Sequence, residues 1–289
     1  MQFEHISILG VGLLGGSVGL AAKSLVNNCK ITGYGHRIET LHQAIDMGAI
    51  DRFELDPADA VKNADLVLLC TPVSIFADIL GQIAPALTAG AIVTDVGSTK
   101  RSVVRLAEQV LPRKVHFVGS HPMAGSEKRG VEYAKPDLFQ NAVCITTPTS
   151  RTNARALRAV ERFWVKLGMS LTRLSPEDHD RLLADVSHLP HALAAALVAM
   201  QLDQGLPLAG KGFLDATRIA AGDGALWRDI LLDNRDNLRA SLARLRTHLG
   251  MLEELLEKGH ESALAAWLDT AAGRRRELLN QKLREVTPD

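Results

Sequence analysis

The chain is poor in the features by which several protein classes are recognised. Only 4% of its residues are aromatic, which argues against a stacking platform for nucleic-acid bases. Lysine plus arginine and aspartate plus glutamate number 33 each, so no net field attracts nucleic acid or an anionic membrane surface. The expected partners are therefore a small-molecule substrate and a second copy of the chain, with no nucleic acid and no membrane.

Cysteine is scarce as well. The three cysteines, Cys29, Cys70 and Cys144, are far apart, lack CxxC spacing and stand in apolar surroundings. This pattern favours buried, reduced thiols and a cytoplasmic location.

A membrane or signal segment is not indicated either. Residues 6–22 carry no charge, but five glycines interrupt them and Glu4, instead of a basic cluster, precedes them. A strand, a turn and a helix explain the stretch better. Ser98 also lacks the GxSxG spacing of a nucleophile elbow, which argues against a hydrolase built on Ser98 and His121.

What the chain does contain is an alternation of short β-rich runs and helical patterns from Phe3 to about Thr147. The runs that read as strands are Ile6–Leu9, Ile31–Tyr34, Leu66–Cys70, Ala91–Thr94, His116–Val118 and Val143–Thr146. Near-continuous Val, Ile and Leu runs are typical of parallel strands covered by helices on both faces. We predict an α/β protein in which residues 1–150 form a Rossmann-type, doubly wound parallel sheet that binds a dinucleotide.

The second half, residues 151–289, is predicted to be helical, with one possible strand near 169–174. Its long stretches are rich in alanine, leucine and arginine at 3.6-residue spacing, and two further helices are expected over 225–249 and 260–283. These helices carry more apolar positions than one helical layer buries. We therefore predict a substrate-binding and dimerisation domain, and a homodimer.

One helix of this half has a marked start and a marked irregularity. Ser175–Asp178 supplies a cap hydroxyl, a proline at the first helical position and acids in the first turn, so a helix should begin there and run toward Met200. Pro190 cannot donate to the carbonyl of Val186 and should kink it. Ser187 and His191, four residues apart, would then share one face.

A glycine fingerprint, GxGxxG at residues 10–15, follows the first strand and opens a helix, which favours binding of a dinucleotide pyrophosphate at the helix N-terminus. The predicted cofactor-binding residues are Gly10, Gly12, Leu13, Leu14, Gly15, His36, Arg37, Thr40, Thr71 and Pro72.

The end of the second strand bears on the choice between NAD and NADP. No acid stands at Gly33–Arg37, where a carboxylate would hold a ribose 2′-hydroxyl. Arg37, with His36 and Thr40, is suited to a 2′-phosphate, so NADP is favoured. The alternative is a solvated Arg37 and loose use of NAD.

The mid-chain run Gly119–Gly130 has neither a helical nor a strand period, and we interpret it as a shaped loop outside the core. Its glycines permit close approach of a ligand, and Pro122 holds His121 on a stiff backbone. A fixed imidazole suits proton transfer near neutral pH. Ser98, after the strand that ends at Thr94, is expected at the ligand-binding edge of the sheet, or as a simple helix cap, and both roles can hold.

Two other polar groupings leave alternatives open. His188 and His191 are candidate metal ligands, but a third ligand is not visible and His179 is expected on the opposite side of the same helix, so a polar pocket wall is the preferred interpretation. Asp215 and Arg218, three residues apart, form either a surface pair or an anchor for a substrate carboxylate.

Taken together, these motifs resemble those of the prephenate/arogenate dehydrogenase family of tyrosine biosynthesis, over nearly the whole chain. The motifs that carry the resemblance are Gly10–Gly15, Asp95–Lys100, His121–Gly125 with Glu127 and Gly130, Leu138–Phe139, Thr147–Pro148, Ser175–Asp180, Ser187–His191, Asp215–Arg218 and Trp227–Asp229.

The resemblance implies hydride transfer from a cyclohexadienol to NAD(P), with loss of the ring carboxylate as carbon dioxide and formation of 4-hydroxyphenylpyruvate or tyrosine. It implies that His121 takes the ring hydroxyl proton, Ser98 orients that pair and Arg218 grips the side-chain carboxylate. Ser187 and His191 would contact substrate. The residues implied to shape or gate the entrance are Glu127, Asp215 and Trp227.

The chain departs from NAD-using members of this family at Gly35, where they carry aspartate, which leaves the cofactor open. Substrate choice is open too, although His191 favours prephenate over arogenate. Two rival interpretations stay: a related β-hydroxyacid or pyrroline-type reductase with the same two-part architecture, and a catalytically silent dinucleotide sensor that dimerises through its helical half.

Overall fold

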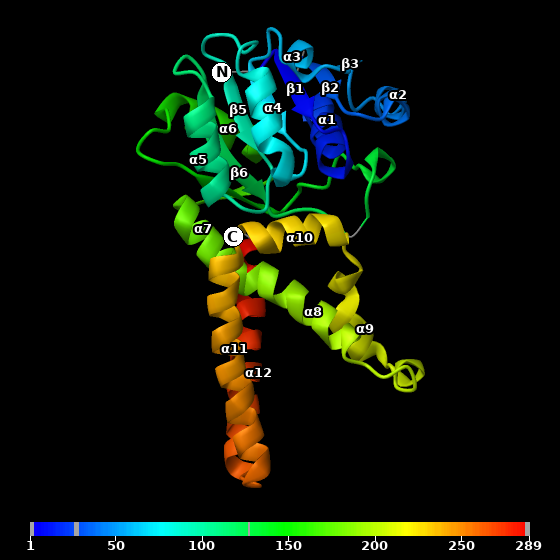
Figure 1. The fold of residues 1–289 in the computed structure, drawn as a ribbon, viewed down its shortest axis with the longest axis vertical. Helices are drawn as coiled ribbons and strands as arrows, with labels where there is room; N and C mark the ends of the chain where they lie inside the picture. The colour runs from blue at the N-terminus through cyan, green and yellow to red at the C-terminus, as the bar shows by residue number, and fades with distance from the viewer. Residues whose placement is uncertain (1–2, 26–28, 127, 287–289) are drawn as a thin grey trace. The chain divides into compact units, whose positions relative to one another are not determined.

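The structure is a computed structural model that describes residues 3–25, 29–126 and 128–286. It divides into two compact units, Met1–Arg235 and Asp236–Asp289 (Figure 1). The first unit holds one eight-stranded sheet and the helices around it. The second consists of a long helix, which begins at its boundary, and the helix that follows it.

The sheet has the strand order β3-β2-β1-β4-β5-β6-β7-β8, and all neighbours run parallel except β6 and β7. The order 3-2-1-4-5-6 is that of a dinucleotide-binding sheet, with its topological switch between β1 and β4. The strands are β1 His5–Leu9, β2 Lys30–Tyr34, β3 Arg52–Glu54, β4 Leu66–Leu69, β5 Ile92–Asp95, β6 His116–Pro122, β7 Val143–Thr147 and β8 Ser170–Arg173.

Helices cover both faces of this sheet, as the apolar strands require. On β4, Leu66 and Leu68 point into one apolar core while Val67 and Leu69 point into the other. One face is packed by α1, α2 and α6, and the other by α3, α4 and α5. These helices span α1 Leu13–Leu25, α2 Ile38–Asp46, α3 Pro57–Ala60, α4 Phe76–Ile83, α5 Arg101–Val110 and α6 Ala154–Lys166. The predicted doubly wound α/β class is confirmed.

The sheet continues beyond residue 150, where the sequence placed the domain boundary. Helix α6 contributes Ala156 and Val160 to a sheet core, and β8 pairs with β7 from Val143↔Ser170 to Thr146↔Arg173. The alanine- and arginine-rich composition of α6 hides this, because its arginines, Arg155, Arg158 and Arg162, lie on the exposed face.

Strand β6 corrects the interpretation of Gly119–Gly130 as a loop outside the core. Residues 116–118 pair with β5, and then 119–122 pair antiparallel with β7, so that His121 lies opposite Ile145. Pro122 is tolerated because β5 has already ended, and no ladder bond is lost there. Gly119 is required by close packing and not by a turn, since a Cβ there would lie 2.4 Å from Thr147 Oγ1.

After the sheet comes a run of helices within the first unit. They are α7 Pro176–Leu183, a π-helical segment Ala184–His188, α8 Leu189–Ala199, α9 Lys211–Thr217, a 3-10 turn Arg218–Ala221 and α10 Gly224–Asp233. The predicted cap is present, because Ser175 Oγ accepts the Asp178 N–H at 3.0 Å. The π turn lies directly before Leu189 and Pro190, where the sequence predicts a kink.

Asn234 ends α10 and separates it from α11 Arg235–Glu257, so the single helix expected over 225–249 is two helices. The last helix is α12 Glu261–Val286. By length and composition alone, Pro176–Ala199 is a stretch that could cross a membrane. It carries His179 and Asp180, which are buried and hydrogen-bonded in the site described next, so it serves as a wall of that site.

Candidate active site

The glycine fingerprint forms a cradle at the carboxyl end of β1. Gly10 has φ +105°, and a Cβ there would lie 2.7 Å from the carbonyl carbon of Cys70. A Cβ on Gly15 would lie 2.1 Å from the Gly10 oxygen, whereas around Gly12 the space is open within 4 Å. Two glycines thus pack the turn tightly and the third leaves room for a ligand to approach the start of α1, where Leu13 and Leu14 stand.

The rest of the predicted cofactor surface follows the next strands. The Thr71 hydroxyl, just after β4, is buried without a partner among the described residues, and Pro72 begins the short turn Val73–Ile75. Arg37 is exposed at the N-cap position of α2, where its side chain makes no cap bond, and Thr40 lies in the first turn. His36 packs edge-on against Tyr34. These residues fit a nicotinamide dinucleotide.

The catalytic candidate His121 lies beyond the end of β5, on the extension of β6. It is buried, and its Nδ1 is 2.9 Å from Nε2 of His179 on α7. His179 Nδ1 is in turn 2.8 Å from Asp180 Oδ1. Asp180 also accepts the main-chain N–H groups of Lys100 and Arg101, at 2.8 and 3.0 Å. A helix of the second half of the chain is thereby joined to the nucleotide-binding sheet.

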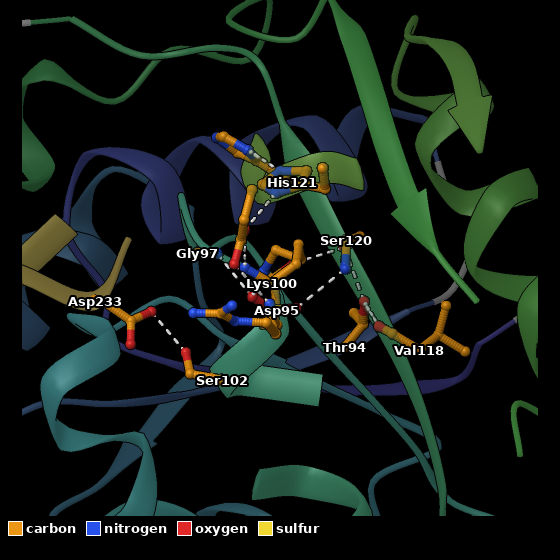
Figure 2. A network of polar contacts seen from close by, with 12 residues as sticks. Thr94, Asp95, Gly97, Lys100, Ser102, Val118, Ser120, His121 and Asp233 are labelled. Atoms are coloured by element: carbon orange, nitrogen blue, oxygen red, sulfur yellow. Dashed lines mark hydrogen bonds and ion pairs between the residues drawn. The ribbon is translucent and has the colours of Figure 1, made fainter. Parts of the chain in front are cut away.

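A second polar network supports this end of the sheet (Figure 2). Lys100 and Asp95 form a fully buried ion pair, and Asp95 also accepts the N–H groups of Gly97 and Ser120, at 2.8 and 3.0 Å. The Ser120 hydroxyl donates to the Asp95 carbonyl and accepts from Trp164 Nε1. Because a buried charge without partners is costly, this saturation fixes the strand ends on which His121 depends.

The electrostatics keep His121 neutral. Burial lowers its pKa well below the usual value, and electrostatic coupling to His179, Lys100 and His188 lowers it further. Burial likewise lowers the pKa of His188 to about 4. A neutral imidazole at physiological pH is the form that accepts a proton.

A pocket of about 270 Å³ opens beside the segment that follows β6. It brings together predicted residues from three distant parts of the chain, His191, Arg218 and Trp227. The indole of Trp227 is stacked on His191, with ring centroids 3.5 Å apart. A Cβ on Gly222 would lie 2.6 Å from Trp227 Nε1, so a larger residue there would displace the stack.

The pocket also contains cations that the sequence analysis missed. Lys128 and Arg129 line it, and Arg129 forms an ion pair with Asp223, the N-cap residue of α10. Adjacent basic residues after a glycine-rich run were visible in the sequence. Their convergence with Arg218 was not, because it depends on how α9 and α10 pack.

The other predicted residues are distributed as follows. Ser98 is half-buried between β5 and α5, and in the described part of the chain the partner of His121 Nδ1 is His179 instead. Ser187 is half-buried in the π segment, and Asp215 is exposed on α9. Glu127 lies outside the described residues. The roles of these four residues remain predictions.

His179 was expected on the opposite side from His188, and this was wrong. Both histidines act electrostatically on His121, and Asn234 Nδ2 bonds both the Asp180 carbonyl and His188 Nδ1. The π segment adds a residue to one turn and so shifts the faces that a 3.6-residue period assigns. For His188 and His191, the described residues offer no third ligand with which to hold a metal.

Comparison with known families agrees with this geometry. Two family models match the chain: the nucleotide-binding domain of prephenate dehydrogenase over residues 18–172 and the prephenate dehydrogenase dimerization domain over residues 175–270. The chain belongs to the prephenate dehydrogenase family. As a member it is an oxidoreductase that uses a nicotinamide dinucleotide.

Individual relatives cover most of the chain. A cyclohexadienyl dehydrogenase from Zymomonas mobilis is 36% identical over 91% of this chain and 95% of its own length. A prephenate dehydrogenase from Bacillus subtilis is 40% identical over 81% of this chain, which spans 65% of that longer protein.

Solved structures give the same result. The prephenate dehydrogenase of Aquifex aeolicus, in complex with hydroxyphenyl propionate and NAD⁺, is 36% identical, covers 96% of this chain and 98% of its own, and superposes with a TM-score of 0.89. A Synechocystis arogenate dehydrogenase is 29% identical, with 95% and 99% coverage and a TM-score of 0.82. A pyrroline carboxylate reductase from Plasmodium falciparum, at 12% identity and a TM-score of 0.50, shares the fold alone.

Proposed function

We propose that this enzyme oxidatively decarboxylates prephenate, with arogenate as the alternative substrate, and that it prefers NADP. The observation that carries the reaction is the buried, neutral His121, which lies on the strand leading into a pocket lined by three cationic side chains, Lys128, Arg129 and Arg218. Prephenate is a dianion, and cations in a partly enclosed pocket suit its two carboxylates.

His121 is the proton acceptor for the ring hydroxyl. Bound NAD(P)⁺ supplies a hydride acceptor for the carbon that bears this hydroxyl. His121 takes the hydroxyl proton as the hydride leaves, and the ring carboxylate departs as carbon dioxide, leaving its electron pair to complete the aromatic ring. The proton then returns from His121 to the phenolate oxygen, so that charge and protons balance.

The pocket residues bind the remainder of the substrate. Arg218 is assigned to the side-chain carboxylate, while His191 and Ser187 contact substrate from the π segment and α8. Trp227, stacked on His191, is assigned to the entrance, and the family resemblance assigns Asp215 and Glu127 to the same role. Burial lowers the pKa of His191, and a neutral imidazole favours the keto side chain of prephenate over the ammonium of arogenate only modestly.

The NADP preference rests on the end of β2. Gly35 offers no carboxylate to repel a 2′-phosphate, and the exposed guanidinium of Arg37, which makes no cap bond, is available to pair with one. We further propose a cytoplasmic homodimer. The match to a dimerization domain and the free state of all three cysteines support it.

The test is a four-way assay of the purified enzyme with prephenate or arogenate and NAD or NADP, followed at the absorbance of reduced nicotinamide. The expected result is turnover of prephenate, faster with NADP at limiting cofactor. Tight cofactor binding without turnover of either diene would instead establish the silent sensor.

A further inference from the structure

Asp180, His179 and His121 form a continuous chain of hydrogen bonds from α7 to the proton-transfer site. The contacts are 2.8 Å between Asp180 Oδ1 and His179 Nδ1, and 2.9 Å between His179 Nε2 and His121 Nδ1. All three side chains are buried, with exposed fractions of 1%, 0% and 7%. Each imidazole nitrogen in this hydrogen-bonded series is either a donor or an acceptor. Once the protonation state of Asp180 is known, the position of the proton on each imidazole can therefore be deduced.

The Asp180 end determines the direction. Its two carboxylate oxygens accept the N–H groups of Lys100 and Arg101 at the start of α5, where the helix dipole also favours negative charge. Burial alone would raise the pKa of Asp180, but these hydrogen bonds and that of His179 hold it below the ordinary value. Asp180 is therefore an ionised group that only accepts, and His179 Nδ1 must carry a proton.

The His179 ring is neutral, which settles the next link. Burial lowers its pKa more than Asp180 raises it, and Lys100 lowers it further. A neutral His179 protonated at Nδ1 presents a lone pair at Nε2. His121 Nδ1 must then donate, which leaves Nε2 of His121 as its basic nitrogen.

We propose that Asp180 and His179 are positioning residues, which hold His121 in the Nδ1–H tautomer so that its Nε2 is the proton acceptor of the reaction. A carboxylate that hydrogen-bonds a catalytic imidazole orients it in the same way. Here a second imidazole, that of His179, lies between the carboxylate and the catalytic histidine. The predicted effect on kcat rests on the proposed function. The tautomer of His121 can be observed without turnover.

Other groups around His121 do not supply this orientation. Lys100 and His188 act on it through charge, and Cys144 on β7 and Asp95 on β5 lie close enough to interact with the same cluster. Among the described residues, the side chain that hydrogen-bonds the His121 ring is that of His179.

The direct test is the tautomer of His121 in the free, full-length enzyme. With ¹⁵N-labelled histidine, the His121 resonances are identified by their loss in His121→Asn. At neutral pH we expect a protonated Nδ1 and an unprotonated Nε2. The opposite tautomer, with the proton on Nε2, would overturn the proposal whatever the activity assay shows.

The kinetic test compares two substitutions of His179. In His179→Gln the amide oxygen can still accept from His121 Nδ1, whereas His179→Leu removes the acceptor. Loss of a supporting partner of this type typically costs about 10- to 100-fold in activity. We expect His179→Leu to lower kcat by that factor with little change in KM, and His179→Gln to recover most of the loss.

Controls separate positioning from folding. His116→Gln lies on the same strand outside the site and should leave kcat unchanged, and circular dichroism and cofactor affinity report whether each variant is folded. Equal kcat values for the Gln and Leu variants in folded protein would refute the positioning role. If the wild-type enzyme turns over no diene, the proposed function fails while the tautomer experiment still decides this inference.

Discussion

His121 illustrates how one residue acquires its chemistry from its surroundings. On the extension of β6 it is removed from water, and burial together with neighbouring positive charge keeps it unprotonated at neutral pH. The sequence placed His121 on a stiff loop outside the core, and a histidine exposed to solvent there would be partly protonated at neutral pH. The position on a paired strand gives both the neutral state and a fixed direction.

Replacing this base tests its role directly. His121→Asn should lower kcat by about 10²–10⁴-fold, because general-base catalysis by a positioned group is worth that much, while cofactor affinity stays nearly the same. Steady-state kinetics and a fluorescence titration of NADP measure the two quantities. Normal turnover of the variant would remove His121 from the mechanism.

A substitution of Arg218 tests whether this residue contributes to substrate binding and not to the chemical step. Loss of a charge-assisted contact costs roughly 1.5–3 kcal/mol, so Arg218→Gln should raise the KM for the diene by about ten- to a hundredfold. Cofactor affinity should not change. Arg181→Gln, which removes an exposed arginine paired with Asp178, is the matched control and should leave the KM at its wild-type value. A fall in cofactor affinity for Arg218→Gln, with KM unmoved, would contradict the assignment.

Gly35 tests the cofactor proposal. A Cβ at this position would contact Leu41 at 3.5 and 3.8 Å, which is ordinary van der Waals contact, so the first atom of a side chain is accommodated there. Gly35→Asp should shift the ratio of kcat/KM toward NAD, because the carboxylate repels a 2′-phosphate and accepts a hydrogen bond from a ribose hydroxyl. If the unmutated enzyme already favours NAD, the argument from Arg37 is wrong.

At the scale of elements, α7 carries His179 and Asp180 and begins at a capped residue. Ser175 Oγ accepts the Asp178 N–H, and Asn153 caps α6 in the same way through the N–H groups of Arg155 and Ala156. Ser175→Ala and Asn153→Ala should each lower the free energy of unfolding by about 1 kcal/mol. Only the first should also lower kcat, since α7 alone holds the partner of His121. Urea unfolding and initial rates give both readouts, and equal kcat values would show that the start of α7 does not control His179.

The same element shows where sequence reasoning stops. The strands other than β3, the glycine cradle and the Ser175 cap follow from local patterns, and the structure has them. The short strand β3 was not predicted. The His121–His179 contact joins residues 58 positions apart, and the π segment changes the helical period that was used to place His179 on the far side. His121 was assigned to a loop because glycine and proline surround it. A proline is compatible with β6 at this point because β5 has ended, so that side of the strand forms no ladder hydrogen bonds.

At the scale of the whole molecule, the second unit exposes apolar side chains that a soluble helix pair does not leave uncovered. These residues are Leu249, Met251, Leu256, Leu268, Leu278 and Leu279. We expect a homodimer that covers them, because several large apolar side chains exposed on one pair of helices are typical of an interface. Light scattering at micromolar concentration should give twice the 31.2 kDa chain mass, and a single chain mass would refute the dimer.

The split pairing of β6 also has a consequence for dynamics. The half of the site that holds His121 belongs to strand β6, which pairs with β5 at residues 116–118 and with β7 at residues 119–122, so its amides should exchange slowly with solvent. The half that holds Arg218 and Trp227 consists of short, partly exposed helices, which open at lower free energy. The rigid half of the site therefore determines the rate of the chemical step, and the more easily opened half determines which substrates bind. Substrate range should be easier to alter by mutation than the rate of hydride transfer.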